Sequence, residues 1–317
     1  MTDTQNEVFK TPVNKIRLFE HGAPGSQNFK LTRKYYTEDM PDGRVKHIVQ
    51  NITDPDIVPY IPDGIGNSTD RQRIPAVLII PGGAFRRLVY NFEGEDVAKW
   101  LNSMGIAAFV LECRLPSDEH DNAEDVPLID AMRAMRVIRG RAQEFGIDEA
   151  KIGVMGFSAG GFMAALLSTA YESDVYADYK YKDEYDKLSA RPDFAVCSYP
   201  VISIDDCIEA GKRYMSEEQV LERISDSKAK ILHKYNPDKL VSPDMPPVFI
   251  CETDDDRTTL SENSVGFYMA ARKAGVSAEL HIFRTGGHGY GCGDDFAQTG
   301  EWKVLFTKWI KSIGIIS

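Results

Sequence analysis

The chain has 317 residues, of which 43% are hydrophobic and 25 are glycine, a composition typical of a packed globular protein. Its 48 acidic residues outnumber its 37 basic residues and give a formal net charge of −11, which would repel nucleic acid and excludes it as an expected partner. No stretch approaches the roughly 18 consecutive apolar residues of a membrane helix, so we expect no membrane association. Residues 1–7 lack the basic and apolar regions of a secretory signal, and we therefore expect a cytoplasmic protein.

The five cysteines are odd in number, lie far apart and form no Cys-x-x-Cys pair. This pattern favours free thiols over disulfides or a zinc site. The chain also has no His/Asp cluster with the spacing of metal ligands, which disfavours a metal-dependent deacetylase. We therefore expect neither a metal nor an organic cofactor.

Residues 1–75 are polar and contain short β-like runs such as 46–50, which we interpret as leading antiparallel strands and loops at a sheet edge. From residue 76 onward, continuous apolar runs typical of doubly covered strands alternate with segments of helical spacing. The predicted strands are 76–80, 106–111, 151–155, 194–198, 248–251 and 278–283, and the predicted helices are 95–103, 127–145, 162–169, 262–273 and 302–313. This alternation predicts an α/β fold with a mostly parallel central sheet and helices on both faces, in a single domain over residues 1–317.

Two segments interrupt the alternation of strands and helices. Residues 171–191 are polar and rich in tyrosine, and residues 204–244 contain amphipathic helical spacing, for example at 217–224. We interpret both insertions as loops or a small lid over the carboxyl ends of the strands.

A Gly-x-Ser-x-Gly motif occupies residues 156–160, between a predicted strand and a predicted helix. A serine hydroxyl becomes a useful nucleophile only when it is held outward and a base takes its proton. The motif meets the first need, because its glycines relieve the crowding of a sharp strand-to-helix turn that exposes the serine. We therefore predict Ser158 as a nucleophile, with an ordinary glycine-rich βα turn as the alternative.

Acyl transfer also requires donors aimed at the oxyanion that develops in the transition state. One donor is the amide after the nucleophile, here Ala159, and the others come from a glycine-rich loop after an earlier strand. Residues 81–85, Pro-Gly-Gly-Ala-Phe, lie in that position, and the amides of Gly83 and Ala84 are the predicted donors. Alone, this segment would suit an ordinary tight turn.

The base should be a histidine late in the chain, with the acid between it and the serine. His281 lies within a strand pattern and His233 within an insertion, whereas His288 lies in a Gly-Gly-His-Gly loop after the last strand. His288 is therefore the predicted base. The run 254–256 offers three aspartates that could orient the imidazole, or could simply form a solvated turn, and spacing alone does not choose among them.

Over most of its length the chain resembles the small α/β-hydrolases known as acetyl xylan esterases and related carbohydrate esterases, of BD-FAE type. The similar segments are 14–24, 49–55, 93–101, 130–136, 198–203 and 262–264. The register of that family selects Asp256 as the acid, three residues before a Val-Pro pair for which this chain has Thr259-Leu260. Two further departures are Gly-Gly-Ala in the oxyanion loop and Phe162-Met163 where His-Leu is common.

We therefore expect a serine carboxylic-ester hydrolase that uses Ser158, Asp256 and His288. The resemblance implies that its substrates are acetyl or other small acyl esters of sugars or xylo-oligosaccharides. The alternatives are a general carboxylesterase on short-chain acyl esters, a peptidase-like hydrolase, which would need an extra domain, and a non-catalytic binding protein with this fold. A small-molecule or oligosaccharide ester is the expected partner, and a homo-oligomer stays open.

Overall fold

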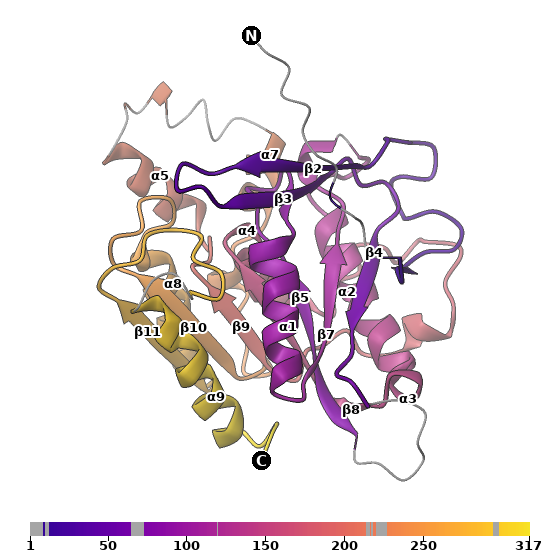
Figure 1. Cartoon of the computed structure of the whole chain (residues 1–317). Coiled ribbons are helices and arrows are strands. Elements are labelled where there is room, and N and C mark those ends of the chain that lie inside the picture. Colours follow the sequence, from indigo (N-terminus) through magenta and orange to yellow (C-terminus); the bar gives the residue numbers. More distant parts are fainter. Residues whose placement is uncertain are drawn as a thin grey trace.

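An eight-stranded sheet, mostly parallel, forms the centre of the computed structural model (Figure 1). The structure describes residues 9, 13–64, 73–118, 120–213, 216, 218–219, 227–293 and 298–317. In spatial order the strands are β1 (Ile16–Arg17), β4 (Asp56–Tyr60), β7 (Ala107–Glu112), β5 (Ile74–Ile80), β8 (Ile147–Phe157), β9 (Ala195–Ser198), β10 (Val248–Thr253) and β11 (Ala278–Phe283). The six strands from β7 through β5, β8, β9 and β10 to β11 are parallel. Beyond β7, strand β4 is antiparallel to it, and the edge strand β1 is in turn antiparallel to β4. The predicted α/β architecture is confirmed.

Helices cover both faces of this sheet (Figure 1). Helix α1 (Asp96–Ser103) connects β5 to β7 on one side of it, and α2 (Val126–Gly140) connects β7 to β8 on the other side of β5. Because crossovers between parallel strands are right-handed, these opposite directions place the two helices on opposite faces of the sheet. On the α1 face, Trp100 packs against Trp302 of α9 (Trp302–Ser312), and on the other face α2 packs against α4 (Ala159–Ala170). The remaining helical elements are η1 (Asn91–Glu95), η2 (Pro116–Asp118), α3 (Ala142–Phe145), η3 (Glu184–Lys187), α5 (Ile204–Lys212), α7 (Ser227–Lys234), η4 (Pro237–Lys239), α8 (Ser261–Lys273) and η5 (Thr299–Glu301).

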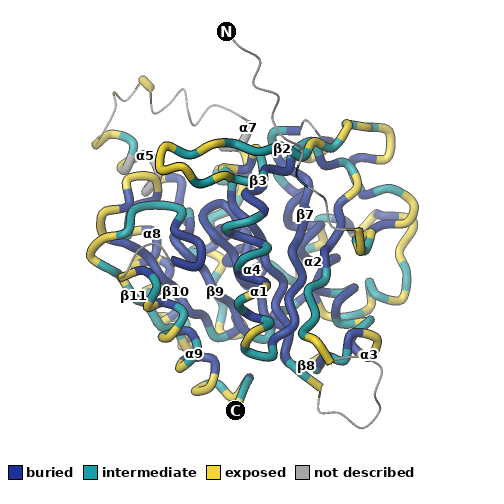
Figure 2. Tube along the Cα trace, in the orientation of Figure 1, coloured by how far each residue is buried: buried dark blue, intermediate teal, exposed yellow. Residues whose placement is uncertain are grey.

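The core lies in the central strands, which are dark blue in Figure 2. Strands β7, β9 and β10 are buried at every position, as the continuous apolar runs predict for strands covered on both faces. No helix in the described ranges combines the length and the apolar character needed to cross a bilayer.

The leading residues divide between two sheets. Strands β1 and β4 lie at the edge of the main sheet, as expected, but β2 (Lys34–Asp39) and β3 (Val45–Gln50) form a separate three-stranded sheet with β6 (Leu88–Val89). The predicted run 46–50 therefore belongs to this second sheet, at the top of Figure 1. Its register pairs Ile48 with Val89, which lies just after the predicted oxyanion loop. The hairpin thus supports that loop from outside the main sheet.

The first insertion, residues 171–191, packs along α2. It begins where α4 ends, at the sheet edge opposite Ser158, and its η3 turn packs along α2. Charge pairing explains this position, because Arg133 of α2 donates to Asp183 at 2.7 Å and to Asp186 at 3.1 Å. This part of the segment therefore covers the side of a helix, and a lid function for the segment stays a prediction.

The second insertion, residues 204–244, begins beyond the carboxyl end of β9. At the end of α7, Lys234 and the following Tyr235 both contact Asp125, at the start of α2 on the same sheet edge as Ser158. Most of the amphipathic segment predicted at 217–224 lies outside the described residues. A lid function for this insertion stays a prediction.

A buried ion pair fastens the end of β7 to α2. Both Arg114 and Asp130 have fully buried side chains, with 2.7 Å between Nη2 and Oδ1. The Arg114 backbone N–H also donates to Asp130 Oδ2 at 2.8 Å, and its guanidinium donates to Ser26 Oγ at 2.8 Å. Burial raises the pKa of the Asp130 carboxyl, and the neighbouring guanidinium offsets part of that rise.

Replacing Asp130 should therefore destabilise the fold strongly. We expect Asp130→Ala to lower the free energy of unfolding by about 3–5 kcal/mol, because Arg114 would keep a buried charge without its partner. Glu144→Ala, which breaks the exposed Arg141–Glu144 pair, is the control and should cost about 0.2–1 kcal/mol. Urea unfolding followed by circular dichroism measures both, and equal small losses would contradict the expectation.

Candidate active site

Ser158 occupies the sharp turn between β8 and α4. Its backbone has φ 54° and ψ −118°, a conformation that a residue with a side chain rarely adopts. The two glycines of the motif allow this turn. A Cβ on Gly156 would lie 1.9 Å from the carbonyl oxygen of Gly160, and a Cβ on Gly160 would lie 1.9 Å from the carbonyl oxygen of Ile80. The motif therefore exists here as a strained turn and not as an ordinary βα loop.

The structure brings the three predicted triad residues together. His288 Nε2 lies 2.8 Å from Ser158 Oγ, and His288 Nδ1 lies 2.6 Å from Asp256 Oδ2. Ser158 follows β8, Asp256 follows β10 and His288 follows β11. These strands are parallel, with β9 between β8 and β10, so their carboxyl ends bring the three residues to the same edge of the sheet. The geometry can transfer a proton from the hydroxyl to the imidazole while the carboxylate orients the ring.

The Asp256 carboxylate is 2% exposed and fully hydrogen-bonded. Its Oδ1 accepts the backbone N–H groups of Thr258 at 2.7 Å and Thr259 at 3.0 Å. Burial acts to raise the pKa of Asp256, but the hydrogen bond and charge of His288, with the two amides, outweigh it, so the net shift is downward. This site therefore favours the ionised carboxylate.

Thr259 is a member of the site that sequence reasoning did not assign. Its hydroxyl lies 3.0 Å from Asp256 Oδ2 and 3.3 Å from His288 Nδ1. The residue stands where the similar family has valine, so the only available signal was a hydroxyl three residues after the aspartate. Thr259 therefore adds a polar contact at the point where the carboxylate meets the imidazole.

The three consecutive aspartates have different surroundings. Asp255 is exposed, and its Oδ1 accepts the backbone N–H groups of Gly286 at 3.0 Å and Gly287 at 2.8 Å, directly before His288. Asp254 is also exposed, and its backbone N–H donates to the carbonyl of Phe283 at 2.8 Å. Only Asp256 directs its carboxylate at the imidazole, while Asp255 holds the loop that carries the ring.

The glycine-rich loop after β5 lies beside the Ser158 turn. Gly83, Ala84 and Phe85 all have positive φ, of 139°, 57° and 58°, which turns successive amides in an unusual direction. Within the described part of the chain, the N–H groups of Gly83, Ala84 and Ala159 donate to no protein acceptor. These are the three amides predicted to hold an oxyanion, and they are available for that role.

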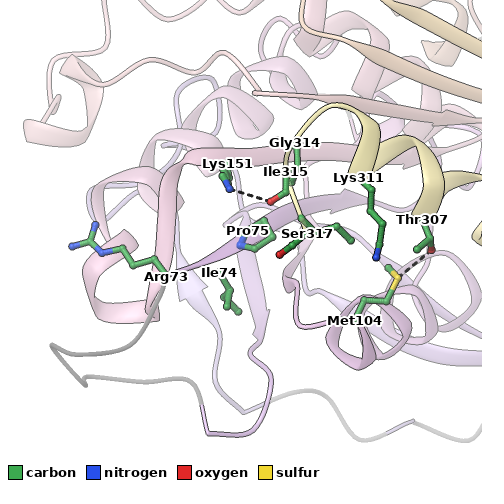
Figure 3. A pocket seen from close by; sticks show the side chains of 11 residues that line it. Arg73, Ile74, Pro75, Met104, Lys151, Thr307, Lys311, Gly314, Ile315 and Ser317 are labelled. Carbon is green, nitrogen blue, oxygen red and sulfur yellow. Dashed lines mark hydrogen bonds between the residues drawn. The ribbon is translucent and has the colours of Figure 1, made fainter.

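One cavity borders the site, and a larger one lies away from it. A very small apolar one, of about 10 Å³, borders the oxyanion loop and is lined by residues that include Gly82, Phe85, Ala159 and Met163. A larger one, of about 770 Å³, lies at the opposite edge of the sheet, where Figure 3 shows Lys151 and Lys311 beside the C-terminal segment 314–317. In the described ranges, no group of three or more His, Cys, Asp or Glu residues could hold a metal ion.

The sheet order, the strained serine turn and the adjoining glycine-rich loop define an α/β-hydrolase. The chain belongs to the BD-FAE family, whose model matches residues 65–270. The predicted family resemblance is therefore confirmed.

Two curated relatives are an acetylxylan esterase from Xylanibacter ruminicola and an endo-1,4-beta-xylanase B from Butyrivibrio fibrisolvens. The first is 30% identical over 240 residues, which are 75% of this chain and 45% of the relative. The second is 29% identical over 269 residues, which are 82% of this chain and 40% of the relative. The chain thus spans less than half the length of either relative.

Among solved structures, the chain is similar to the acetyl ester-xyloside bifunctional hydrolase from Caldicellulosiruptor lactoaceticus, with a TM-score of 0.71 and 35% identity. That match covers 96% of this chain and 97% of the other. The carboxylesterase Cest-2923 from Lactobacillus plantarum matches with a TM-score of 0.66 and 21% identity, covering 90% of this chain and 99% of the other. The second likeness supports the fold alone.

Because the three aspartates have different surroundings, their replacement by asparagine should lower kcat to different extents. We expect Asp256→Asn to lower kcat for p-nitrophenyl acetate by about 10⁴-fold, because the amide no longer holds the required tautomer or stabilises the imidazolium. Asp255→Asn keeps an acceptor for the glycine amides and should stay within roughly 10-fold of the parent, and Asp254→Asn within about 2-fold. Full activity in Asp256→Asn together with loss in either neighbour would assign the acid to that neighbour instead.

Proposed function

We propose that the chain is a serine carboxylic-ester hydrolase in which Ser158 is the nucleophile, His288 the general base and Asp256 the acid of a catalytic triad. The observation that supports this most directly is the continuous contact from Ser158 Oγ to His288 Nε2 at 2.8 Å and from His288 Nδ1 to Asp256 Oδ2 at 2.6 Å. The strained backbone of Ser158 supports the same role, because strain of this kind is typical of nucleophile turns.

In the proposed reaction, Ser158 Oγ attacks the ester carbonyl while His288 Nε2 takes the hydroxyl proton. The amides of Gly83, Ala84 and Ala159 donate to the oxyanion of the tetrahedral intermediate. Collapse of the intermediate breaks the bond to the alcohol, and the imidazolium gives its proton to that leaving group. Water then attacks the acyl-enzyme in the same way and releases the carboxylic acid and the free serine.

We propose acetyl or other small acyl esters of sugars or xylo-oligosaccharides as the substrates. The names of two similar proteins, an acetylxylan esterase and an acetyl ester-xyloside bifunctional hydrolase, support this class. A general short-chain carboxylesterase is the second candidate, because the same contacts among Ser158, His288 and Asp256 would serve it.

We further propose that residues 1–317 form a single domain and work in the cytoplasm. One continuous core cluster, which extends from Leu18 to Ile315, supports the single domain. The buried free thiols of Cys113, Cys197 and Cys251 are in keeping with a reducing compartment.

Removing the nucleophile should abolish hydrolysis. We expect Ser158→Ala to lower kcat for p-nitrophenyl acetate at least roughly 10⁴-fold without unfolding the protein, because no other group forms the acyl-enzyme. Release of p-nitrophenol measures turnover, and circular dichroism checks the fold. Undiminished turnover in a folded Ser158→Ala protein would refute the mechanism.

The acyl and alcohol preferences can be tested separately. We expect kcat/KM for p-nitrophenyl acetate to exceed that for the octanoate by at least roughly 10-fold, because a site that serves small acyl groups has no room for the added methylene groups. Acetylated xylo-oligosaccharide should release acetate in the presence of the parent protein but not of Ser158→Ala. Short-chain preference without acetate from the sugar would leave the general carboxylesterase, and preference for octanoate would contradict the small acyl pocket.

A further inference from the structure

A buried glutamate next to the triad is not used by the proposed reaction. Glu93 lies in η1, just before α1, and is only 5% exposed. Its Oε2 accepts the backbone N–H of Gly82 at 2.8 Å, and its Oε1 accepts the hydroxyl of Tyr199 at 2.9 Å. Gly82 immediately precedes the predicted oxyanion donors Gly83 and Ala84. One carboxylate oxygen of Glu93 is therefore attached to the start of the oxyanion loop.

The other oxygen leads to the histidine loop through Tyr199. The Tyr199 side chain is fully buried after β9, and its hydroxyl oxygen accepts the backbone N–H of Gly291 at 3.0 Å. Its ring packs edge-on against His288, with 5.0 Å between the ring centroids. Gly291 lies three residues after His288 in the same loop. Tyr199 therefore supports the imidazole by ring contact and the loop by hydrogen bonding.

The environment of Glu93 opposes its charge. Burial raises the pKa of the Glu93 carboxyl, whereas the charge of His288 and the hydrogen bonds from Tyr199 and Gly82 offset part of the rise. Placing a carboxyl group in such surroundings costs free energy unless its contacts are satisfied. Each Glu93 oxygen has a donor, and those donors belong to two different loops of the site.

We propose that Glu93 is a positioning residue, which sets the oxyanion loop and the His288 loop relative to each other through Gly82 and Tyr199. This inference rests on the proposed esterase function, because it assigns a task within the same site. Glu93 does not contact the substrate. It holds the oxyanion donors on one side of Ser158 and the imidazole on the other, so that both are positioned to contact the tetrahedral intermediate at the same time.

The test compares Glu93→Ala, Glu93→Gln and Tyr199→Phe with p-nitrophenyl acetate as substrate. We expect Glu93→Ala to lower kcat about 100-fold, the size of the loss of one oxyanion donor, with KM within roughly 3-fold of the parent. Glu93→Gln should recover to within about 10-fold, since its amide oxygen can still accept from Gly82 and its amide nitrogen can reach Tyr199. Tyr199→Phe keeps the ring beside His288 but removes the hydroxyl, and should lower kcat roughly 10-fold.

Inhibition by phenylboronic acid provides a second readout, because boronic acids form a tetrahedral adduct with the serine that uses the oxyanion donors. We expect Glu93→Ala to weaken this inhibition by about the same factor as it lowers kcat/KM. A change in kcat/KM with unchanged boronic acid affinity would overturn the positioning role. So would a Glu93→Ala variant with kcat within about 3-fold of the parent, or equal losses in Glu93→Ala and Glu93→Gln.

Asp118 offers a matched control for the loss of a buried carboxyl group. It is 8% exposed, and its Oδ2 accepts the backbone N–H of Ile52 at 3.2 Å, just as Glu93 accepts that of Gly82. Asp118→Ala should lower the melting temperature and leave kcat of the folded protein unchanged. A purely structural role for Glu93 would make Glu93→Ala behave in the same way.

The controls also separate this inference from the proposed function. Ser158-dependent turnover with normal kinetics in the Glu93 variants would overturn the positioning role alone. No Ser158-dependent turnover in the parent protein would overturn both proposals. If Glu93→Ala does not fold, Glu93→Gln and Tyr199→Phe still decide the question, because both nearly keep the side-chain volume of the parent residue. Parental kcat in Tyr199→Phe would overturn the link to the His288 loop.

Discussion

The close approach of backbone at the Ser158 turn is the constraint on which the rest of the site depends. Gly160 touches the carbonyl of Ile80, at the end of β5, so the start of α4 is pressed against the strand that leads into the oxyanion loop. The Ser158 N–H also donates to the Ser198 carbonyl at 3.0 Å, which ties the turn to the end of β9. The Ser158 turn is thereby held between β5 and β9, the two strands that flank β8. The groups around Ser158 therefore have fixed positions.

Parallel pairing gathers the remaining groups. Strands β5, β8, β10 and β11 all point in one direction, so their carboxyl ends bring the oxyanion loop, the nucleophile turn, the aspartate turn and the histidine loop to one edge. Contacts outside the main sheet then hold these loops in place. Asp255 holds the amides of Gly286 and Gly287, and the hairpin of β2 and β3 supports the oxyanion loop through β6. Most of these supports lie in turns, where polar groups can meet without disturbing the core.

Much of the fold could be predicted from the sequence, because central strands buried on both faces appear as continuous apolar runs. The strand predicted at 278–283 coincides with β11, and the helix predicted at 262–273 lies within one residue of α8. The packing of the segment 171–191 against α2 could not be predicted, since it depends on pairing between its aspartates and Arg133, which is distant in the chain. Glu93 was not assigned because its partners, Gly82 and Tyr199, are distant in the chain. Thr259 was not assigned because its hydroxyl approaches His288, on another loop, only in the folded chain.

The sequence by itself determined the order of strands and helices, the turn at Ser158 and the loop that carries His288, because these features depend on local glycines and on apolar periodicity. The family resemblance selected Asp256 as the acid, but only the tertiary structure gives the physical reason why its carboxylate faces the imidazole. Asp254, Asp255 and Asp256 occupy one short turn, so spacing along the chain cannot distinguish them. Their difference arises from what packs against each one, and Asp256 alone is buried against His288 and the amides of its own turn.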